Sequence, residues 1–268
     1  MMIAVNRFRQ MTVIAAFETH RKVLSWRMLL SILCAVVVCI LAYSNGSSAA
    51  SGLEGTEASN AIARPFVASA SLVLAICATA MSTESLSEEF ERRSGFITFT
   101  KPLSRNVLFV GKFVSGFLSS TVVLATYYMI TYVVCFAVVG EIPERFLTSI
   151  PLALLYTLAA TGVCMFFSSI APRGSMAMMA AFLLLVVLQI FMQNVGFDSE
   201  PWLSLGYESG ILGDYVLGNQ TEFQLDSEGR MRASDYVPEL DIACSVMAAY
   251  AILSTLYAAF VFRYRNMR

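Results

Sequence analysis

Charged residues are scarce in this chain of 268 residues, and this scarcity indicates its class. Only 14% of the residues are Asp, Glu, Lys or Arg, whereas 57% are hydrophobic and the mean hydropathy is +0.67. A soluble domain carries about 25% charged residues, because its surface faces water. The composition therefore excludes an ordinary soluble globular protein and predicts a protein embedded in lipid.

Residues that build catalytic and metal sites are also few. The one histidine, His20, has no metal-ligand spacing around it, and no glycine-rich loop ends in Gly-Lys-Ser or Gly-Lys-Thr. No long apolar run contains paired carboxylates or a serine beside a base, which disfavours an intramembrane enzyme. We expect no catalytic residue, metal or cofactor in this chain, and no ATP hydrolysis by the chain alone.

The six cysteines include no Cys-x-x-Cys pair, and each falls within a long apolar run. Thiols in such surroundings are typically buried and inert. We therefore favour this interpretation over disulfides or a metal relay.

Long apolar runs dominate what is present. About 20 apolar residues cross the hydrocarbon core of a bilayer as a helix, and six charge-free windows approach or exceed that length. The predicted fold is an all-α integral membrane protein with six transmembrane helices in a single transmembrane domain. The spans are expected at about residues 24–43, 65–83, 109–140, 146–171, 175–196 and 242–262.

Three further segments complete the predicted organisation. Residues 1–23 carry cationic side chains beside apolar ones, which suits a helix lying in the membrane interface, although an ordinary cytoplasmic lead-in helix fits about as well. Residues 44–56 are rich in small and turn-forming residues and are expected to form a flexible loop. Residues 197–241 form a long acidic loop, whose first half is apolar enough to dip into the outer leaflet as short helices.

The basic residues predict the orientation, because Lys and Arg near span ends are retained on the cytoplasmic side. With the N-terminus inside, 14 of the 18 basic residues fall on the cytoplasmic face, while most acidic residues fall on the other. We therefore expect a multi-pass protein of the cell membrane with both termini cytoplasmic, and an extracytoplasmic loop at 197–241.

No ionisable side chain lies near the middle of any predicted span, although carriers driven by protons or ions usually need such residues for coupling. Either energy for transport comes from another component, or the chain does not pump a substrate actively. Hydrogen bonding between helices is the favoured role for the polar residues inside the spans, over a role in a substrate path. The candidates for the path are Tyr128, Thr131, Tyr132, Gln189 and Gln193.

A polar segment separates the second and third predicted spans. Residues 87–112 hold eight of the chain's 37 formal charges. A segment so charged cannot lie in hydrocarbon. It is therefore predicted to form an aqueous contact surface on the cytoplasmic side, with residues 84–108 as its coupling segment.

Four short patterns follow one another in this segment: Glu88-Glu89-x-Glu91, Ser94-Gly95, Pro102-Leu103-Ser104-Arg105 and Gly111-Lys112. Each is weak alone. Their order, their spacing and their place among six spans resemble the type-two ABC transporter permeases, whose members have six spans and cytoplasmic ends. The resemblance covers the whole chain in layout. It is strongest to the branch of prokaryotic exporters and permeases annotated for copper-enzyme maturation.

The resemblance implies the membrane-spanning subunit of an ATP-driven exporter. A separate ABC ATPase subunit would bind ATP and Mg, and a second permease copy or a paralogue would complete the transporter. The resemblance does not name the transported substrate. The lipid bilayer would surround the chain, and nucleic acid is not expected as a partner. The residues implied in coupling to the ATPase are Glu88, Glu89, Glu91, Arg92, Arg93, Gly95, Pro102, Ser104 and Arg105. The alternative is a membrane scaffold or assembly factor that recruits an extracytoplasmic partner without translocation.

Overall fold

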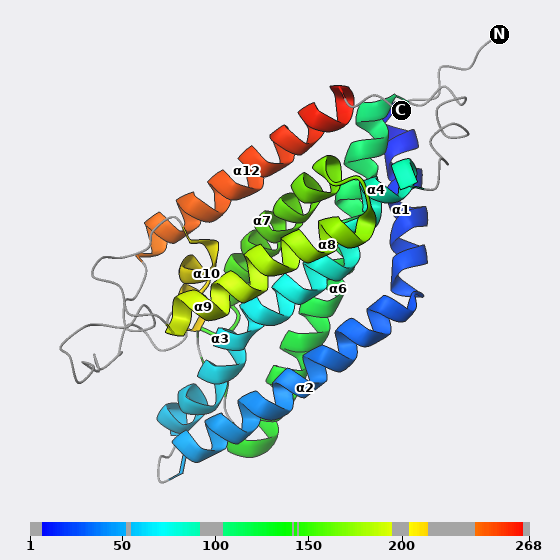
Figure 1. Ribbon diagram of the computed structural model, residues 1–268. Coiled ribbons are helices and arrows are strands. Elements are labelled where there is room, and N and C mark those ends of the chain that lie inside the picture. Colours follow the sequence, from blue (N-terminus) through cyan, green and yellow to red (C-terminus); the bar gives the residue numbers. More distant parts are fainter. Residues whose placement is uncertain are drawn as a thin grey trace.

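The computed structural model describes residues 7–51, 55–91, 104–140, 142–143, 145–194, 204–213 and 239–264, with the side chains of residues 7, 88–91 and 192–194 left aside. Within these ranges the elements are helices and no strand occurs (Figure 1). The elements are α1 (Arg7–Val23), α2 (Trp26–Ala49), α3 (Gly55–Ser82), α4 (Glu84–Glu91), α6 (Arg105–Val139), α7 (Ser149–Ile170), α8 (Gly174–Phe182), the π-helix η1 (Leu183–Val187), α9 (Leu188–Asn194), α10 (Leu205–Glu208) and α12 (Leu240–Tyr264).

Among the described residues, six helical stretches are long and apolar enough to cross a membrane. They are α2, α3, α6, α7, the continuous rod that begins with α8, and α12. A backbone that spans lipid must satisfy its own polar groups, and a helix does so internally. The predicted all-α integral membrane fold is confirmed.

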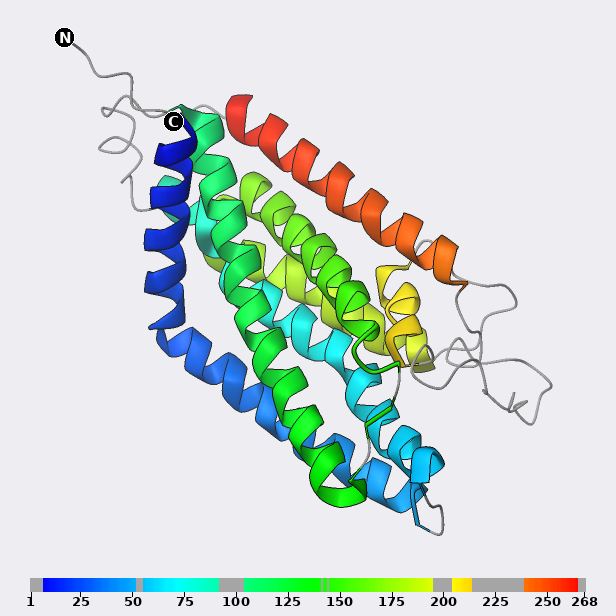
Figure 2. The ribbon, with the colours of Figure 1, turned by 180° about the vertical axis from the view of Figure 1, so that it is seen from behind.

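Helices α3 and α7 form the centre of the bundle. α3 packs against α2, α6 and α7, and α7 packs in addition against α12. The buried core includes Phe66 and Leu74 of α3 and Tyr156 of α7. Helices α2 and α12 therefore lie on opposite sides of the bundle, as Figures 1 and 2 show.

The outer faces of α2 and α12 are apolar and exposed. Large aliphatic and aromatic side chains follow one another along both helices, as expected for surfaces that contact lipid tails. They include Leu29, Leu33, Val37 and Ile40 on α2, and Ile252, Leu253, Leu256 and Phe260 on α12.

The helices on either side of the turn between α2 and α3 are longer than the sequence indicates. α2 continues to Ala49 and α3 begins at Gly55, so the prediction of a flexible loop over 44–56 is wrong for most of that range. The serines are compatible with a helix here because their hydroxyls bond to carbonyls of the preceding turn, for example Ser48 to Ser44 at 2.9 Å. Gly46 also packs closely against α3, where a Cβ would lie 3.1 Å from the Cα of Ile62.

Helix α1 lies along the first part of α6, which both views show. Their contact is close at Gly111, where a Cβ would lie 2.8 Å from Cγ2 of Ile14. Two residues join α1 to α2, and Ser25 caps α2 by accepting a hydrogen bond from the backbone N–H of Met28 at 3.3 Å. An interfacial position for α1 stays a prediction.

Part of the predicted 197–241 loop belongs to the bundle. Helix α10 packs against α9 and α12, and Leu205 and Leu212 are buried. Gly213 meets α3, since a Cβ there would lie 2.8 Å from that of Ala68. Residues 197–203 and 214–238 of this loop lie outside the described residues, and α12 already begins at Leu240.

Candidate coupling site

The short polar helix α4 follows α3 at the end of the bundle where α6 and α8 begin and α7 ends (Figures 1 and 2). It contacts α6, α7 and α8 as well as α3. The predicted coupling residues Glu88, Glu89 and Glu91 lie on this helix, although their side chains are outside the described set. Arg92, Arg93, Gly95 and Pro102 also lie outside the described residues.

The start of α4 is bound to α7 through one hydroxyl. Ser168 Oγ accepts hydrogen bonds from the backbone N–H groups of Leu86 at 3.0 Å and Ser87 at 3.2 Å. The first turn of a helix leaves such N–H groups without partners inside the helix. All three residues are fully buried, so no solvent competes with this contact. α7 therefore supplies the cap of α4.

A buried lysine connects α4 to α6 and α1. Lys112 of α6 is only 2% exposed, and its Nζ donates to the carbonyl oxygen of Ser85 at 2.6 Å. Glu18 of α1 has its Oε1 4.0 Å from the same nitrogen. Its Oε2 forms an ion pair with Arg21 at 2.9 Å. A buried charge is stable only when it is paired and hydrogen-bonded. Lys112 thus fixes α4 in place.

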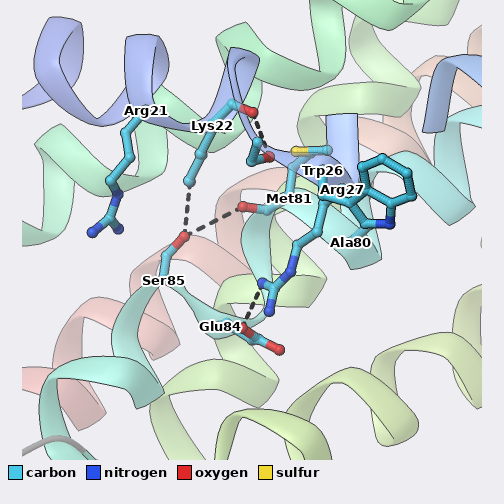
Figure 3. A pocket seen from close by; sticks show the side chains of 9 residues that line it. Arg21, Lys22, Trp26, Arg27, Ala80, Met81, Glu84 and Ser85 are labelled. Atoms are coloured by element: carbon cyan, nitrogen blue, oxygen red, sulfur yellow. Dashed lines mark hydrogen bonds and ion pairs between the residues drawn. The ribbon is translucent and has the colours of Figure 1, made fainter. Parts of the chain in front are cut away.

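A second set of contacts reaches α4 from the corner between α1 and α2 (Figure 3). Lys22 Nζ donates to Ser85 Oγ at 2.8 Å, and Arg27 forms an ion pair with Glu84 at 2.5 Å. Ser85 therefore binds two lysines, one at its hydroxyl and one at its carbonyl. On the opposite side α8 begins at Gly174, where a Cβ would lie 3.0 Å from Cγ of Glu84.

The far end of the coupling segment is held at the start of α6. Ser104 is the N-cap of this helix and accepts a hydrogen bond from the backbone N–H of Val107 at 3.4 Å. Arg105 Nη1 donates to the carbonyl oxygen of Arg263 at 2.9 Å, which connects α6 to the end of α12.

Gln189, one of the five candidates for a substrate path, forms hydrogen bonds with three other segments. It is 2% exposed, and its Nε2 donates to Ser71 of α3 at 2.8 Å and to Ser209 after α10 at 3.3 Å. The hydroxyl of Tyr156 on α7 lies 3.4 Å from its Oε1. This geometry matches the interhelical hydrogen bonding that we favour for Gln189. The Gln193 side chain lies outside the described set.

The candidates on α6 lie in different surroundings. Tyr128 is buried and its hydroxyl lies 3.1 Å from Ser149 Oγ of the α7 start, whereas Tyr132 is 40% exposed. Thr131 is buried, with its hydroxyl bound to the carbonyl oxygen of Tyr127 at 3.0 Å. No hydrogen bond among the described residues connects these three side chains with Gln189.

The structure adds residues that sequence reasoning missed. Lys112 and Ser168 bind α4 but are not among the predicted coupling residues, and only Lys112 has a sequence signal, because it belongs to the Gly111-Lys112 pattern just before a long charge-free run. Ser168 has none, since serines are common in membrane helices. Among the described residues no group of three metal-ligating side chains is present.

In the part of the chain that the structure describes, six apolar helical stretches with a polar helix held at one end define a multi-pass membrane protein. Residues 12–211, which are 200 of the 268, match the family model described as ABC-2 family transporter protein. The chain belongs to this family. A search of curated proteins gives no match to it.

Proposed function

We propose that this chain is the permease subunit of an ATP-driven ABC transporter, in which a separate ATPase supplies the energy and substrate is exported. The anchoring of α4 carries the proposal. A helix that receives a push from a cytosolic partner transmits it only if it is fixed to the membrane-spanning helices. Ser168 and Lys112 provide such a connection to α7 and α6, in a site without competing water.

The proposed mechanism uses the contacts that connect α4 to α6 and α7. ATP and Mg would be bound by the ATPase, whose closure would move α4 through Glu88, Glu89 and Glu91, together with Arg92 and Arg93. Opposite charges on one surface favour the encounter and orientation of a partner. Because breaking the buried hydrogen bonds of Ser85, Leu86 and Ser87 would leave polar groups unpaired, α6 and α7 would move together with α4.

Several finer points belong to the same proposal. The chain would sit in the cell membrane with both termini cytoplasmic and would pair with a second copy or a paralogue. The prokaryotic exporter branch, which includes permeases annotated for copper-enzyme maturation, is the proposed assignment within the family. Tyr132 is exposed enough to face a path between two permeases.

The first test is a pull-down of the tagged chain from native membranes in mild detergent, with mass spectrometry of the companions and an ATPase assay. We expect a stoichiometric ATPase whose hydrolysis falls when Glu88→Lys and Glu89→Lys are combined. An intact chain with no ATPase companion would refute the permease assignment. The scaffold alternative would then direct attention to residues 197–241.

A second test separates docking from coupling. Ser168→Ala removes the acceptor for the first turn of α4 but leaves the α4 surface unchanged. We expect the ATPase still to bind, while the substrate-dependent part of its hydrolysis is reduced. Loss of binding in this variant would show that Ser168 acts on docking instead.

A further inference from the structure

A cleft of about 330 Å³ lies between the α1–α2 corner and the junction of α3 with α4 (Figure 3). It is at the same end of the bundle as the coupling site. Its walls come from residues 21–27 on one side and from residues 80–85 on the other.

The charges that line the cleft favour an anion. Arg21, Lys22 and Arg27 face one carboxylate, that of Glu84, which leaves an excess of two positive charges. Arg27 contacts Glu84 and Arg21 contacts Glu18. A guanidinium has five N–H donors, so the ion pair of Arg27 with Glu84 does not use all the donors of Arg27. The side chains of Arg21 and Arg27 are 52% and 47% exposed. Planar guanidinium groups suit the oxygens of a phosphate.

The surroundings of these charges are apolar. Leu24 and Trp26 are 72% and 71% exposed, and α2 continues with exposed Leu29 and Leu30 on the following turn. Tryptophan and basic residues beside the start of a membrane span lie at the level of the lipid headgroups. A ligand that fits has a phosphate at the cleft and an apolar part along α2.

We propose that this cleft binds the phosphate of an anionic membrane phospholipid, with its acyl chains against the exposed face of α2. The lipid phosphate would bind Arg21 and Arg27 while Lys22 keeps its hydrogen bond with Ser85. Because Glu84 and Ser85 begin α4, the bound lipid would stabilise the position of that helix. The site does not depend on the direction of transport or on an ATPase.

The test uses Trp26 as a probe of nearby lipid. The chain has two tryptophans, and the other, Trp202, lies outside the described residues, so Trp202→Phe leaves Trp26 alone. This full chain is placed in bilayers of phosphatidylcholine and phosphatidylglycerol, with bromine on the acyl chains of one lipid at a time. We expect brominated phosphatidylglycerol to quench Trp26 several-fold more than its share of the bilayer predicts.

Charge variants decide whether the cleft is responsible. Arg21→Gln combined with Arg27→Gln removes the two charges assigned to the phosphate but keeps hydrogen-bond donors, and should lower the preference for the anionic lipid about tenfold, since each basic residue near the headgroups contributes to anionic lipid binding. The matched control, Arg173→Gln with Arg263→Gln, removes two exposed charges at the same end and should leave the preference unchanged. Native mass spectrometry of retained lipids, with both tryptophans in place, provides an independent readout.

Three results would overturn the proposal. Quenching that follows the bulk lipid composition would show no site, and an equal loss in the control pair would show only a general surface charge. Displacement of the lipid by inorganic phosphate, at an ionic strength matched with chloride, would assign the cleft to a soluble anion. None of these outcomes bears on ATPase binding, so failure here is distinguishable from failure of the proposed function.

Discussion

Ser168 lies on α7, yet its hydroxyl oxygen accepts the backbone N–H of Leu86 on α4 at 3.0 Å. The two residues are far apart in sequence, and both are fully buried. Helix caps are usually supplied by the residue just before the helix. Here the cap comes from the transmembrane core, so α4 cannot leave its position without exposing its own first turn.

Ser168→Ala is therefore expected to destabilise the protein by about 1–2 kcal/mol, because two buried N–H groups lose their acceptor. The matched control is Ser119→Ala on α6, since Ser119 is equally buried but bonds only to the carbonyl of Ser115 in its own helix. Thermal unfolding in detergent measures both. Equal midpoints for the two variants would contradict a capping role for Ser168.

Replacing each of the two lysines that bind Ser85 is expected to lower the stability of the protein by a different amount. Lys112→Met removes a buried donor and should cost about 2 kcal/mol, because the Ser85 carbonyl loses a charge-assisted hydrogen bond. Lys22→Met should cost less, since Lys22 is partly exposed and the Ser85 hydroxyl also bonds to the Met81 carbonyl. Denaturation midpoints of the two variants provide the comparison. A larger loss for Lys22 would mean that the buried lysine does not hold α4.

A variant of Glu18 shows which partner of Lys112, the Glu18 carboxylate or the Ser85 carbonyl, contributes more to stability. The carboxylate lies 4.0 Å from the lysine nitrogen, whereas the Ser85 carbonyl lies at 2.6 Å. In a double-mutant cycle of Lys112→Met and Glu18→Gln, we expect a coupling energy below about 1 kcal/mol. A coupling as large as the whole loss from Lys112→Met would show that the ion pair, not the backbone contact, stabilises this site.

Gln189→Leu is expected to lower stability by about 1–3 kcal/mol, because Ser71 and Ser209 lose their buried donor. Transport per folded molecule should stay unchanged if the residue serves only to connect helices. Tyr132→Phe is the comparison for a substrate path, because that side chain is exposed on α6. A changed substrate preference in Gln189→Leu at unaltered stability would restore Gln189 to the path.

The sequence predicts the class and the number of spans because hydrocarbon imposes its requirement on every residue of a span. It does not predict where helices end, since packing overrides the turn-forming preference of residues 44–49. The order of short motifs predicts a coupling segment between the second and third spans, and this role stays a prediction. The contact from Ser168 depends on two segments meeting in three dimensions, and the pattern around that serine carries no sign of it.

Gly46→Ala examines that packing directly. Replacing glycine by alanine inside a helix normally stabilises it by up to about 1 kcal/mol. At Gly46, however, a Cβ would lie 3.0 Å from the carbonyl oxygen and 3.1 Å from the Cα of Ile62. These are backbone atoms, so no change of rotamer can relieve the contact, and α2 must move away from α3.

Overpacking of this kind costs about 1–3 kcal/mol, which exceeds the gain in helix propensity. We expect a net loss of stability for Gly46→Ala, whereas Ser48→Ala, at an exposed position two residues on, should stay within about 0.5 kcal/mol of the parent. Thermal unfolding of the two variants in the same detergent measures the difference. A stabilised Gly46→Ala variant would mean that the C-terminal end of α2 is free to separate from α3, and the extended helices found there would then be a consequence of local propensity rather than of packing.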